Sequence, residues 1–196
     1  MTTVTPIHVA DFLIEGEVMP VYVHLIEHPR GRILVDTGFT ELHPAVDDMT
    51  PSLVAWQPPA VDYVVNTHLH FDHLGGNHLY AGTPVCVQRQ ELEDARTLDE
   101  YTIPEWVDPP GVEYVPVDGE LELLPGVRLV PAPGHTRGSQ IVVVDGERPV
   151  VIAGDTAVWF GELDEPETEG QRMIVAMHPQ RVWLSHTTEP WVPSGT

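Results

Sequence analysis

The stretch Thr67-His68-Leu69-His70-Phe71-Asp72-His73 places three imidazoles and one carboxylate within six consecutive positions. Imidazole and carboxylate are the side-chain groups that bind transition-metal ions most often in proteins. Side chains two positions apart in an extended segment point to the same side, so His68 and His70 can converge on one ion. This stretch therefore predicts a metal site.

The residues around this stretch predict how it is held. Val61–Asn66 is rich in β-branched and aromatic residues, which favours a strand that carries the histidines to the edge of a sheet. Asp72 and His73 are adjacent, so the chain has to bend after Phe71 to aim both at a common point. We expect Gly75-Gly76 to supply the backbone freedom for that bend.

Three further candidate ligands each follow an apolar run later in the chain. His135 comes after 127–131, Asp155 after 150–154, and His186 after 181–185. Three strand ends that each present one ligand predict a centre for two ions, both with open coordination positions as in catalytic sites. The predicted ligands are His68, His70 and His135 for one ion, Asp72, His73 and His186 for the other, and Asp155 as a bridge.

Several motifs spread from residue 34 to residue 186 carry a family resemblance. They are Leu34-Val35-Asp36-Thr37-Gly38, the His-X-His-X-Asp-His run, Pro133-Gly134-His135-Thr136 with Gly138-Ser139, Gly154-Asp155-Thr156 and Ser185-His186. In these motifs and their order the chain resembles the metallo-β-lactamase-fold hydrolase superfamily. Residues 67–77 are most similar to N-acyl homoserine lactonases.

The resemblance implies a fold, a cofactor and a reaction. The fold would be α+β, a four-layer αββα sandwich with the site at one edge of the β-sandwich. Two zinc ions per chain are implied, and iron or manganese are compatible with the same ligands. We expect a metal-bridged hydroxide to attack the carbonyl of a small lactone or ester, with Asp72 as a candidate to protonate the leaving oxygen.

Two departures from the lactonase pattern keep other activities open. Those lactonases usually have a tyrosine three residues after the bridging aspartate, where it contacts the substrate carbonyl, whereas this chain has Val158. The chain is also shorter than typical members, so loops that cover the substrate are expected to be trimmed. A thioesterase resembling glyoxalase II and an iron-dependent oxidoreductase resembling persulfide dioxygenase are the alternatives.

Other residues near the motifs are candidates for supporting the site. Asp36 follows an apolar run and precedes a short turn, so we expect it to hydrogen-bond a metal ligand, and the alternative is that it only shapes the turn. Aromatic and apolar residues close to the Asp36 and Asp155 motifs are candidates for a substrate pocket: Phe39, Val158, Trp159 and Phe160.

Composition indicates one compact enzyme domain over 1–196. The chain is 42% hydrophobic and 20% charged, with a formal net charge of −21 from nine arginines and thirty acidic residues. The electrostatic field of this negative charge repels phosphate backbones, so we expect no nucleic-acid partner and a neutral or weakly charged small-molecule substrate.

The sequence lacks a membrane-spanning run and a signal-like N-terminus, which predicts a cytoplasmic protein that does not act on membranes. A homodimer is possible, and the single Cys86 reads as a buried, inert thiol.

Hydrophobic patterning predicts the main elements. Residues 7–14 and 18–26 alternate as a β-hairpin, and 32–35 continues the sheet. Residues 88–97 and 167–177 have helical character. The proline-containing segment 98–112 is expected to join two halves, each with strands followed by helices, whose ligands meet at one edge.

Overall fold

Two β-sheets packed face to face form the centre of the fold, and the computed structural model describes residues 2–193. The first sheet has the strand order β4-β1-β2-β3-β5-β6-β7, and the second has the order β12-β11-β10-β9-β8. The strands of the first sheet are β1 (Thr3–Ile14), β2 (Glu17–His28), β3 (Gly31–Val35), β4 (Ser52–Leu53), β5 (Tyr63–Val65), β6 (Pro84–Gln88) and β7 (Glu113–Val117). Those of the second are β8 (Leu121–Leu124), β9 (Val127–Pro131), β10 (Gln140–Val144), β11 (Val150–Ile152) and β12 (Arg181–Trp183).

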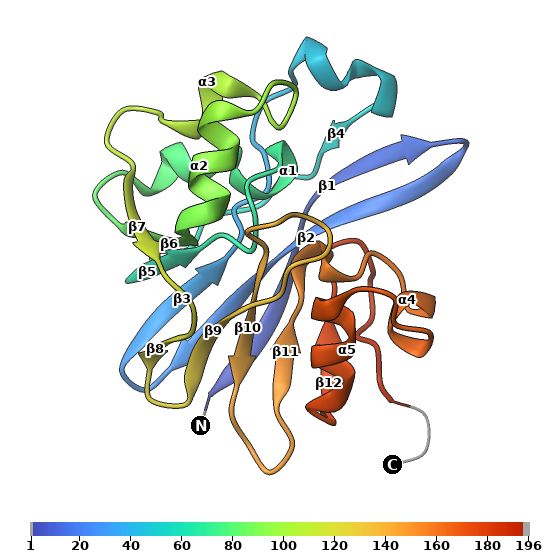
Figure 1. Ribbon diagram of the computed structural model, residues 1–196. Coiled ribbons are helices and arrows are strands. Elements are labelled where there is room, and N and C mark those ends of the chain that lie inside the picture. The colour runs from blue at the N-terminus through green and yellow to red at the C-terminus, as the bar shows by residue number, and fades with distance from the viewer. Residues whose placement is uncertain (1, 194–196) are drawn as a thin grey trace.

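Helices cover the outer faces of both sheets. Figure 1 shows α1, α2 and α3 grouped beside β5, β6 and β7, and α4 and α5 grouped beside β11 and β12. The α-helices are α1 (Phe71–Leu74), α2 (Arg89–Thr97), α3 (Pro104–Val107), α4 (Gly161–Asp164) and α5 (Glu169–Ala176). Three 3-10 helices, η1 (Pro44–Met49), η2 (Asn77–Tyr80) and η3 (Gly154–Thr156), complete the elements. The layers follow the expected order αββα.

Alternating side chains produce the three cores between these layers. Val64 of β5 packs among the residues beneath α1 to α3, whereas its neighbour Val65 packs between the two sheets. In β10, Val142 lies between the sheets and Val143 lies beneath α4 and α5. Strands buried on both faces read as continuous apolar runs, which is why 61–65 and 140–144 are almost wholly apolar.

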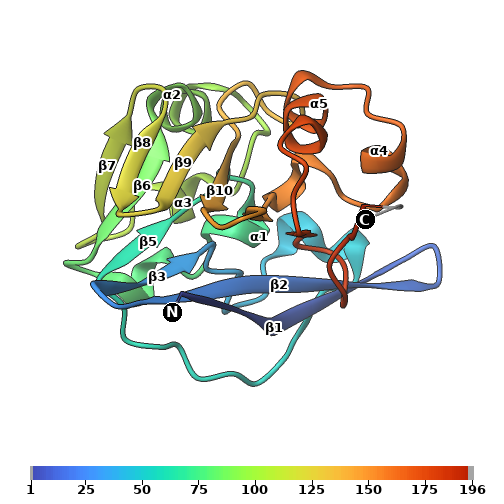
Figure 2. The same cartoon turned by 90° about the horizontal axis from the view of Figure 1, so that it is seen from below.

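The predicted β-hairpin is present and longer than expected. β1 and β2 pair antiparallel from Thr3 opposite Glu27 to Ile14 opposite Glu17, with a register irregularity between His8 and Ala10. The tip of the hairpin projects beyond the rest of the first sheet (Figure 2). The predicted helices also form, as α2 and α5, and α5 begins with a capping box between Thr168 and Gln171.

The expectation that 98–112 joins the two halves is wrong. This segment lies between α2 and β7, both of which belong to the first half, and its residues Ile103, Trp106 and Val107 are buried in the core beneath the first sheet. The chain crosses to the second sheet between β7 and β8, through residues 118–120. Proline is tolerated in 98–112 because Pro104 starts α3, where no backbone donor is needed.

The strand ends that carry the motifs meet at one edge of the sandwich. Two backbone hydrogen bonds join the sheets there, from Gln140 N to Thr67 O (2.8 Å) and from Tyr22 N to Ser185 O (2.8 Å). They hold the segments after β5 and β12 against neighbours from the opposite sheet. No helix within residues 2–193 has the length and apolar character of a membrane span.

Candidate metal centre

The first three predicted ligands converge, although they come from different sheets. His70 Nδ1 lies 3.1 Å from His68 Nε2 and 3.0 Å from His135 Nε2. His68 and His70 follow β5, and His135 lies in the loop between β9 and β10. We call these three residues the first ligand group.

The second ligand group consists of Asp72, His73 and His186. Asp72 Oδ2 lies 3.7 Å from His73 Nε2 and 3.5 Å from His186 Nε2. All three side chains are buried. In each group the candidate ligand atoms lie within 4.8 Å of one another, a spacing that one metal ion can span.

Asp155 lies between the two groups. Its Oδ1 is 3.4 Å from His73 Nε2, and its Oδ2 is 3.2 Å from His186 Nε2 and 3.7 Å from His135 Nε2. One carboxylate therefore faces both groups, which is the position expected of a bridging ligand. All seven predicted ligands thus gather at one point.

The donor set fits metal ions. Among the described residues, His73 Nε2 and Asp155 Oδ1 are buried without a hydrogen-bond partner. Buried polar atoms without partners are costly, and a cation between them would satisfy both. Ring nitrogens of three histidines also face one another within the first group, an arrangement that a shared cation stabilises.

Hydrogen bonds made by Nδ1 of His73 and of His186 orient these two rings so that their Nε2 atoms point into the centre. His73 Nδ1 donates to Asp36 Oδ2 (2.8 Å), and His186 Nδ1 donates to the carbonyl oxygen of Pro20 (2.9 Å). Because a carboxylate and a carbonyl can only accept a hydrogen bond, these bonds place a proton on Nδ1 of each ring. The lone pair of Nε2 is then the one that can bind a metal. Asp36 thus lies where it was predicted to support a ligand.

Asp36 also holds the start of the histidine stretch. Its two oxygens accept from Thr67 N and Thr67 Oγ1, both at 2.7 Å. The Asp36 backbone has a φ of 60°, in the left-handed region that aspartate tolerates better than most residues. This conformation turns the carboxylate from the end of β3 toward the segment after β5.

The bend that aims Asp72 and His73 is a helix start. His70 has extended backbone angles (φ −67°, ψ 155°) and precedes α1, so Asp72 and His73 project from the first turn of a helix. The expectation that Gly75-Gly76 supplies unusual backbone freedom is wrong, because Gly75 is right-handed helical (φ −60°) and Gly76 has a φ of −92°. Their small size is what matters, since a Cβ at Gly76 would collide with the carbonyl oxygen of Thr37.

Burial and neighbouring charges divide the histidines into two electrostatic classes. Burial lowers the pKa of His68 well below its ordinary value, and burial together with the nearby His135 lowers the pKa of His70 to about 4. For His186 burial acts in the same direction, but Asp155 and Asp72 outweigh it and raise the pKa to about 9. The same carboxylates, with Asp36, raise the pKa of His73. The carboxylates around the second group therefore favour positive charge at that position.

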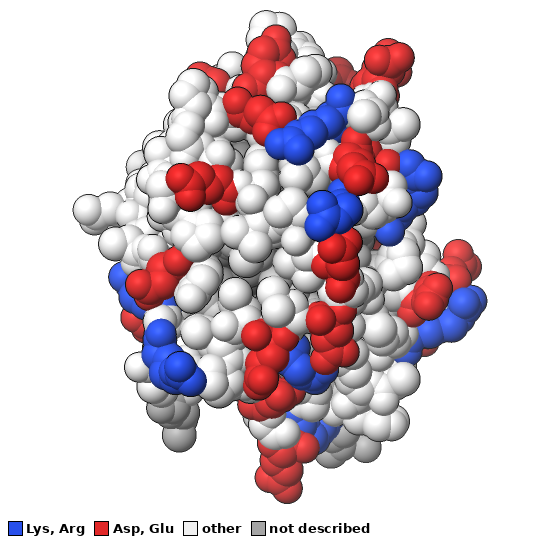
Figure 3. Space-filling model, turned by 60° about the vertical axis from the view of Figure 1, so that its left-hand side comes forward, with Lys and Arg blue, Asp and Glu red and all other residues white. Residues whose placement is uncertain are grey.

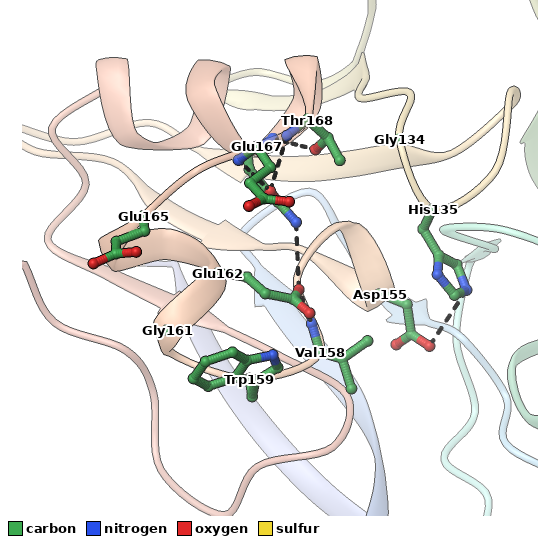
Figure 4. A pocket seen from close by; sticks show the side chains of 11 residues that line it. Gly134, His135, Asp155, Val158, Trp159, Gly161, Glu162, Glu165, Glu167 and Thr168 are labelled. Atoms are coloured by element: carbon green, nitrogen blue, oxygen red, sulfur yellow. Dashed lines mark hydrogen bonds and ion pairs between the residues drawn. The ribbon is translucent and has the colours of Figure 1, made fainter.

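Two cavities open onto Asp155, and a third, about 360 Å³, borders His70 and His135 together with Arg137. The larger of the two, about 690 Å³, is bordered by the ligands His70, Asp72, Asp155 and His186 and has mostly apolar walls. These walls include Phe12, Ile14, Met19, Val46, Met49, Phe71, Ile103 and Val158. The smaller of the two, about 450 Å³, reaches His135 and Asp155 and contains Glu162, Glu165 and Glu167 (Figure 4).

The predicted pocket residues divide evenly. Val158 borders both cavities, and Trp159 borders the smaller one with 61% of its surface exposed. Phe39 is instead buried in the core beneath the first sheet, stacked on Phe12, and Phe160 packs against the core beneath α4 and α5. The expectation that Phe39 and Phe160 line a substrate pocket is therefore wrong, because both rings pack against hydrophobic cores.

The residues that form the apolar wall of the larger cavity were not predicted from the sequence. Phe12 belongs to β1. Its place in an alternating strand indicates that its side chain is buried, but does not indicate that it borders the larger cavity. Tyr101 and Ile103 lie in the segment that was interpreted as a linker, yet Tyr101 borders the larger cavity with its ring 5.2 Å from that of His70. No local pattern signals this contact, because Tyr101 lies in the loop between α2 and α3 and its neighbour His70 is distant in the sequence.

The surface carries the excess negative charge. On the face shown in Figure 3, acidic side chains lie around a hollowed area of uncharged atoms, with some arginines beside them. Several arginines pair with single carboxylates, as in Arg89–Asp118 and Arg96–Asp108. Because thirty acidic residues face only nine arginines, most of the negative field is left uncompensated.

A sandwich of this kind, with histidine and aspartate loops at one edge, defines the protein class. The chain belongs to the metallo-β-lactamase superfamily, whose sequence pattern matches residues 16–174. Within that superfamily it is similar to curated N-acyl homoserine lactonases. It is 34% identical to one from a Bacillus species over 173 residues, and 34% identical to one from Bacillus cereus over 156 residues.

The similarity extends to a solved lactonase structure. A variant of the Bacillus thuringiensis lactonase AiiA, with N-decanoyl-L-homoserine bound at its active site, superposes with a TM-score of 0.72 at 25% identity. That match covers 94% of this chain and 92% of the other. The two curated matches cover 74% and 68% of this chain and 68% and 62% of the relatives, so the chain spans about two thirds of their length. The expected fold, family and metallo-hydrolase class are confirmed.

Proposed function

We propose that this protein hydrolyses small lactones of the N-acyl homoserine type at a centre of two zinc ions. The observation that carries the proposal is the gathering of seven ligand side chains into two groups with Asp155 between them, at the mouth of a mostly apolar cavity. The similarity to lactonases supports the choice of substrate class.

The proposed centre assigns one role to each set of residues. The first group would hold one ion, the second group the other, and Asp155 would contact both. Two ions held in this way supply a solvent molecule of lowered pKa and an electrophile for the carbonyl oxygen of the substrate. Imidazole and carboxylate suit zinc, and iron or manganese are alternatives for the same ligands.

Asp72 is the proposed catalytic residue of the chain. It is a member of the second group and also borders the larger cavity, so its carboxylate faces both the centre and the space for the substrate. From this position it can receive a proton from the attacking solvent molecule and deliver it to the leaving oxygen of the opened lactone.

The cavities favour a neutral substrate with an apolar chain. The apolar wall formed by Phe12, Val46 and Met49 offers burial to an acyl chain while the carbonyl lies at the ligands. Among the described residues, no arginine borders either of the two cavities at Asp155, whereas Arg137 borders the third cavity beside His70 and His135. This argues against binding of an acidic peptide thioester in either of the two cavities at Asp155.

Val158 stands where the lactonase pattern has tyrosine, and it borders both cavities. Its side chain offers no hydrogen-bond donor, so carbonyl polarisation is assigned wholly to the ions in this proposal. The extent of one domain over 1–196, a cytoplasmic location and a homodimer stay predictions from the sequence.

The test combines metal content with a substrate panel. Purified protein should contain about two zinc ions per chain and open N-acyl homoserine lactones faster than it cleaves thioesters or aryl esters. His70→Ala and Asp155→Ala should lose metal and activity together, whereas His28→Ala, outside the centre, should keep both. Full activity in a metal-free variant, or oxygen consumption by a protein that contains iron, would contradict the proposal.

A further inference from the structure

A buried carboxylate lies beside the first ligand group and is not one of its members. Glu91, in the first turn of α2, has none of its surface exposed to solvent. Among the described residues it forms no ion pair with arginine or histidine. A buried carboxylate without a cationic partner is costly unless several donors satisfy it.

Three donors satisfy Glu91. Its Oε1 accepts from Leu69 N (2.8 Å) and from the Tyr101 hydroxyl (2.6 Å). Its Oε2 accepts from Thr136 Oγ1 (2.6 Å). Hydrogen bonds to a charged acceptor are stronger than those between neutral groups, so this carboxylate connects its three partners firmly.

The three partners flank every ligand of the first group. Leu69 lies between His68 and His70 in the sequence, and Thr136 directly follows His135. Tyr101 places its ring beside that of His70, at 5.2 Å between centroids. A single carboxylate therefore connects the segment after β5 to the loop between β9 and β10.

Close packing reinforces this connection. A Cβ at Gly138 would collide with the backbone nitrogen of Glu91, so the loop between β9 and β10 lies directly against the start of α2. One turn later Asp94 accepts two hydrogen bonds from the Arg137 guanidinium. Helix α2 thus holds this loop at two points, one buried and one at the surface.

We propose that Glu91 is a positioning residue that holds His70 and His135 at the separation at which both can bind the first metal ion. The inference rests on the proposed function only in requiring that the first group binds metal. Their ring nitrogens lie 3.0 Å apart although 65 residues separate them in the sequence. Besides Glu91, the backbone hydrogen bond from Gln140 N to Thr67 O also joins the two segments, but it lies three positions from His70 and five positions from His135 in the sequence.

The second group has different supports, so the effect should be confined to one ion. His73 is held by Asp36, and His186 by the carbonyl oxygen of Pro20. Neither of these contacts involves Glu91. A role of Glu91 in general stability would instead weaken both groups together, and this difference separates the two explanations.

The experiment titrates metal-free protein with Co²⁺ and follows the visible absorption of the bound ion, with metal content measured by mass spectrometry. Glu91→Ala should weaken one of the two binding steps by about 10- to 100-fold and leave the other within about twofold, the range seen when supporting contacts of metal ligands are removed. Glu93→Ala, which removes the same charge from the exposed side of α2, should bind both ions like the wild type.

Rescue by the conservative variant is the second readout. In Glu91→Gln the amide oxygen can still accept from Leu69 N and Tyr101, and the amide nitrogen can donate to Thr136 Oγ1. Thr136 can then donate to Ser139 Oγ, which lies 2.6 Å away. Glu91→Gln should therefore keep the weaker step within about fivefold of the wild type, because each of the three hydrogen bonds of Glu91 has a replacement.

Wild-type binding of both ions by a folded Glu91→Ala variant would overturn the inference, and so would equal weakening of both steps. If Glu91→Ala does not fold, Thr136→Val removes the contact of Glu91 to the loop, together with the hydrogen bond between Thr136 Oγ1 and Ser139 Oγ, and keeps the contacts of Glu91 to Leu69 and Tyr101. This variant should weaken the same single step by about 3- to 10-fold. Unchanged binding in Thr136→Val would then overturn it. Binding of two ions without lactone hydrolysis would refute the proposed function and leave this inference intact, because the titration needs no substrate.

Discussion

The carboxylate of Asp36 and the imidazole of His73 lie 2.8 Å apart, both buried, although Asp36 directly follows β3 and His73 lies in helix α1. This contact sets which nitrogen of His73 faces the other ligands. Asp36→Ala should therefore weaken metal binding by the second group and lower kcat/KM by about 10- to 100-fold. Asp48→Ala, at an exposed position, is the control. Activity within twofold of the wild type, with two ions bound, would show that Asp36 only shapes its turn.

The apolar wall of the larger cavity predicts a dependence on acyl-chain length. Met49 borders this cavity and is only partly buried, so a larger side chain can be placed there without disrupting the core. Met49→Trp should raise KM for lactones with long acyl chains by about tenfold, because each excluded methylene loses about 0.8 kcal/mol of burial. KM for short-chain lactones should change little. An equal change in KM for long-chain and short-chain lactones would mean that the acyl chain does not lie against this wall.

His24 predicts a loss of stability in mild acid. It is buried between the sheets with no partner for Nε2, and burial, with His73 nearby, lowers its pKa to about 3. Below the ordinary pKa of about 6.5 the unfolded chain takes up a proton that the folded protein cannot, so stability falls as the pH drops. By pH 5 this one group should lower the free energy of unfolding by roughly 2 kcal/mol.

The His24 prediction is measured by urea unfolding at pH 7.5 and pH 5.0 in the presence of a chelator. His24→Phe should lose about 2 kcal/mol of the pH dependence shown by the wild type. His28→Phe, in a more exposed position near the end of β2, should keep the wild-type pH dependence. An equal drop in the free energy of unfolding between pH 7.5 and pH 5.0 for the wild type and His24→Phe would mean that His24 accepts a proton within the fold.

The Cys86 thiol should be inert in the folded protein. It is buried between the two sheets, and burial raises its pKa to about 11. At pH 8 only about one thiol in a thousand would be ionised, and solvent reaches it poorly, so a disulfide reagent should label it at least about 100-fold more slowly than in urea. Rapid labelling of the native protein would mean that the sandwich opens locally.

Local patterns were enough to predict which seven residues gather at the centre, and in which order along the chain they come. Each of the segments around His68, His135, Asp155 and His186 follows an apolar run, and the structure places a strand before each of them. Because strands in one sandwich end at shared edges, residues just after them meet there, and imidazole and carboxylate side chains are rarely grouped without a cation. The hairpin, α2 and α5 were predictable for a similar reason, since their periodicity is local.

Long-range packing decided the surroundings of the ligands. Phe39 and Phe160 face cores, Tyr101 reaches the centre from a segment that resembles a linker, and Glu91 binds two ligand-bearing segments from within a helix. None of this is visible in the order of residues, because a side chain's neighbours depend on how helices are seated on the sheets. A ligand is recognisable from its own chemistry, whereas the role of a wall or supporting residue depends on what lies beside it in space.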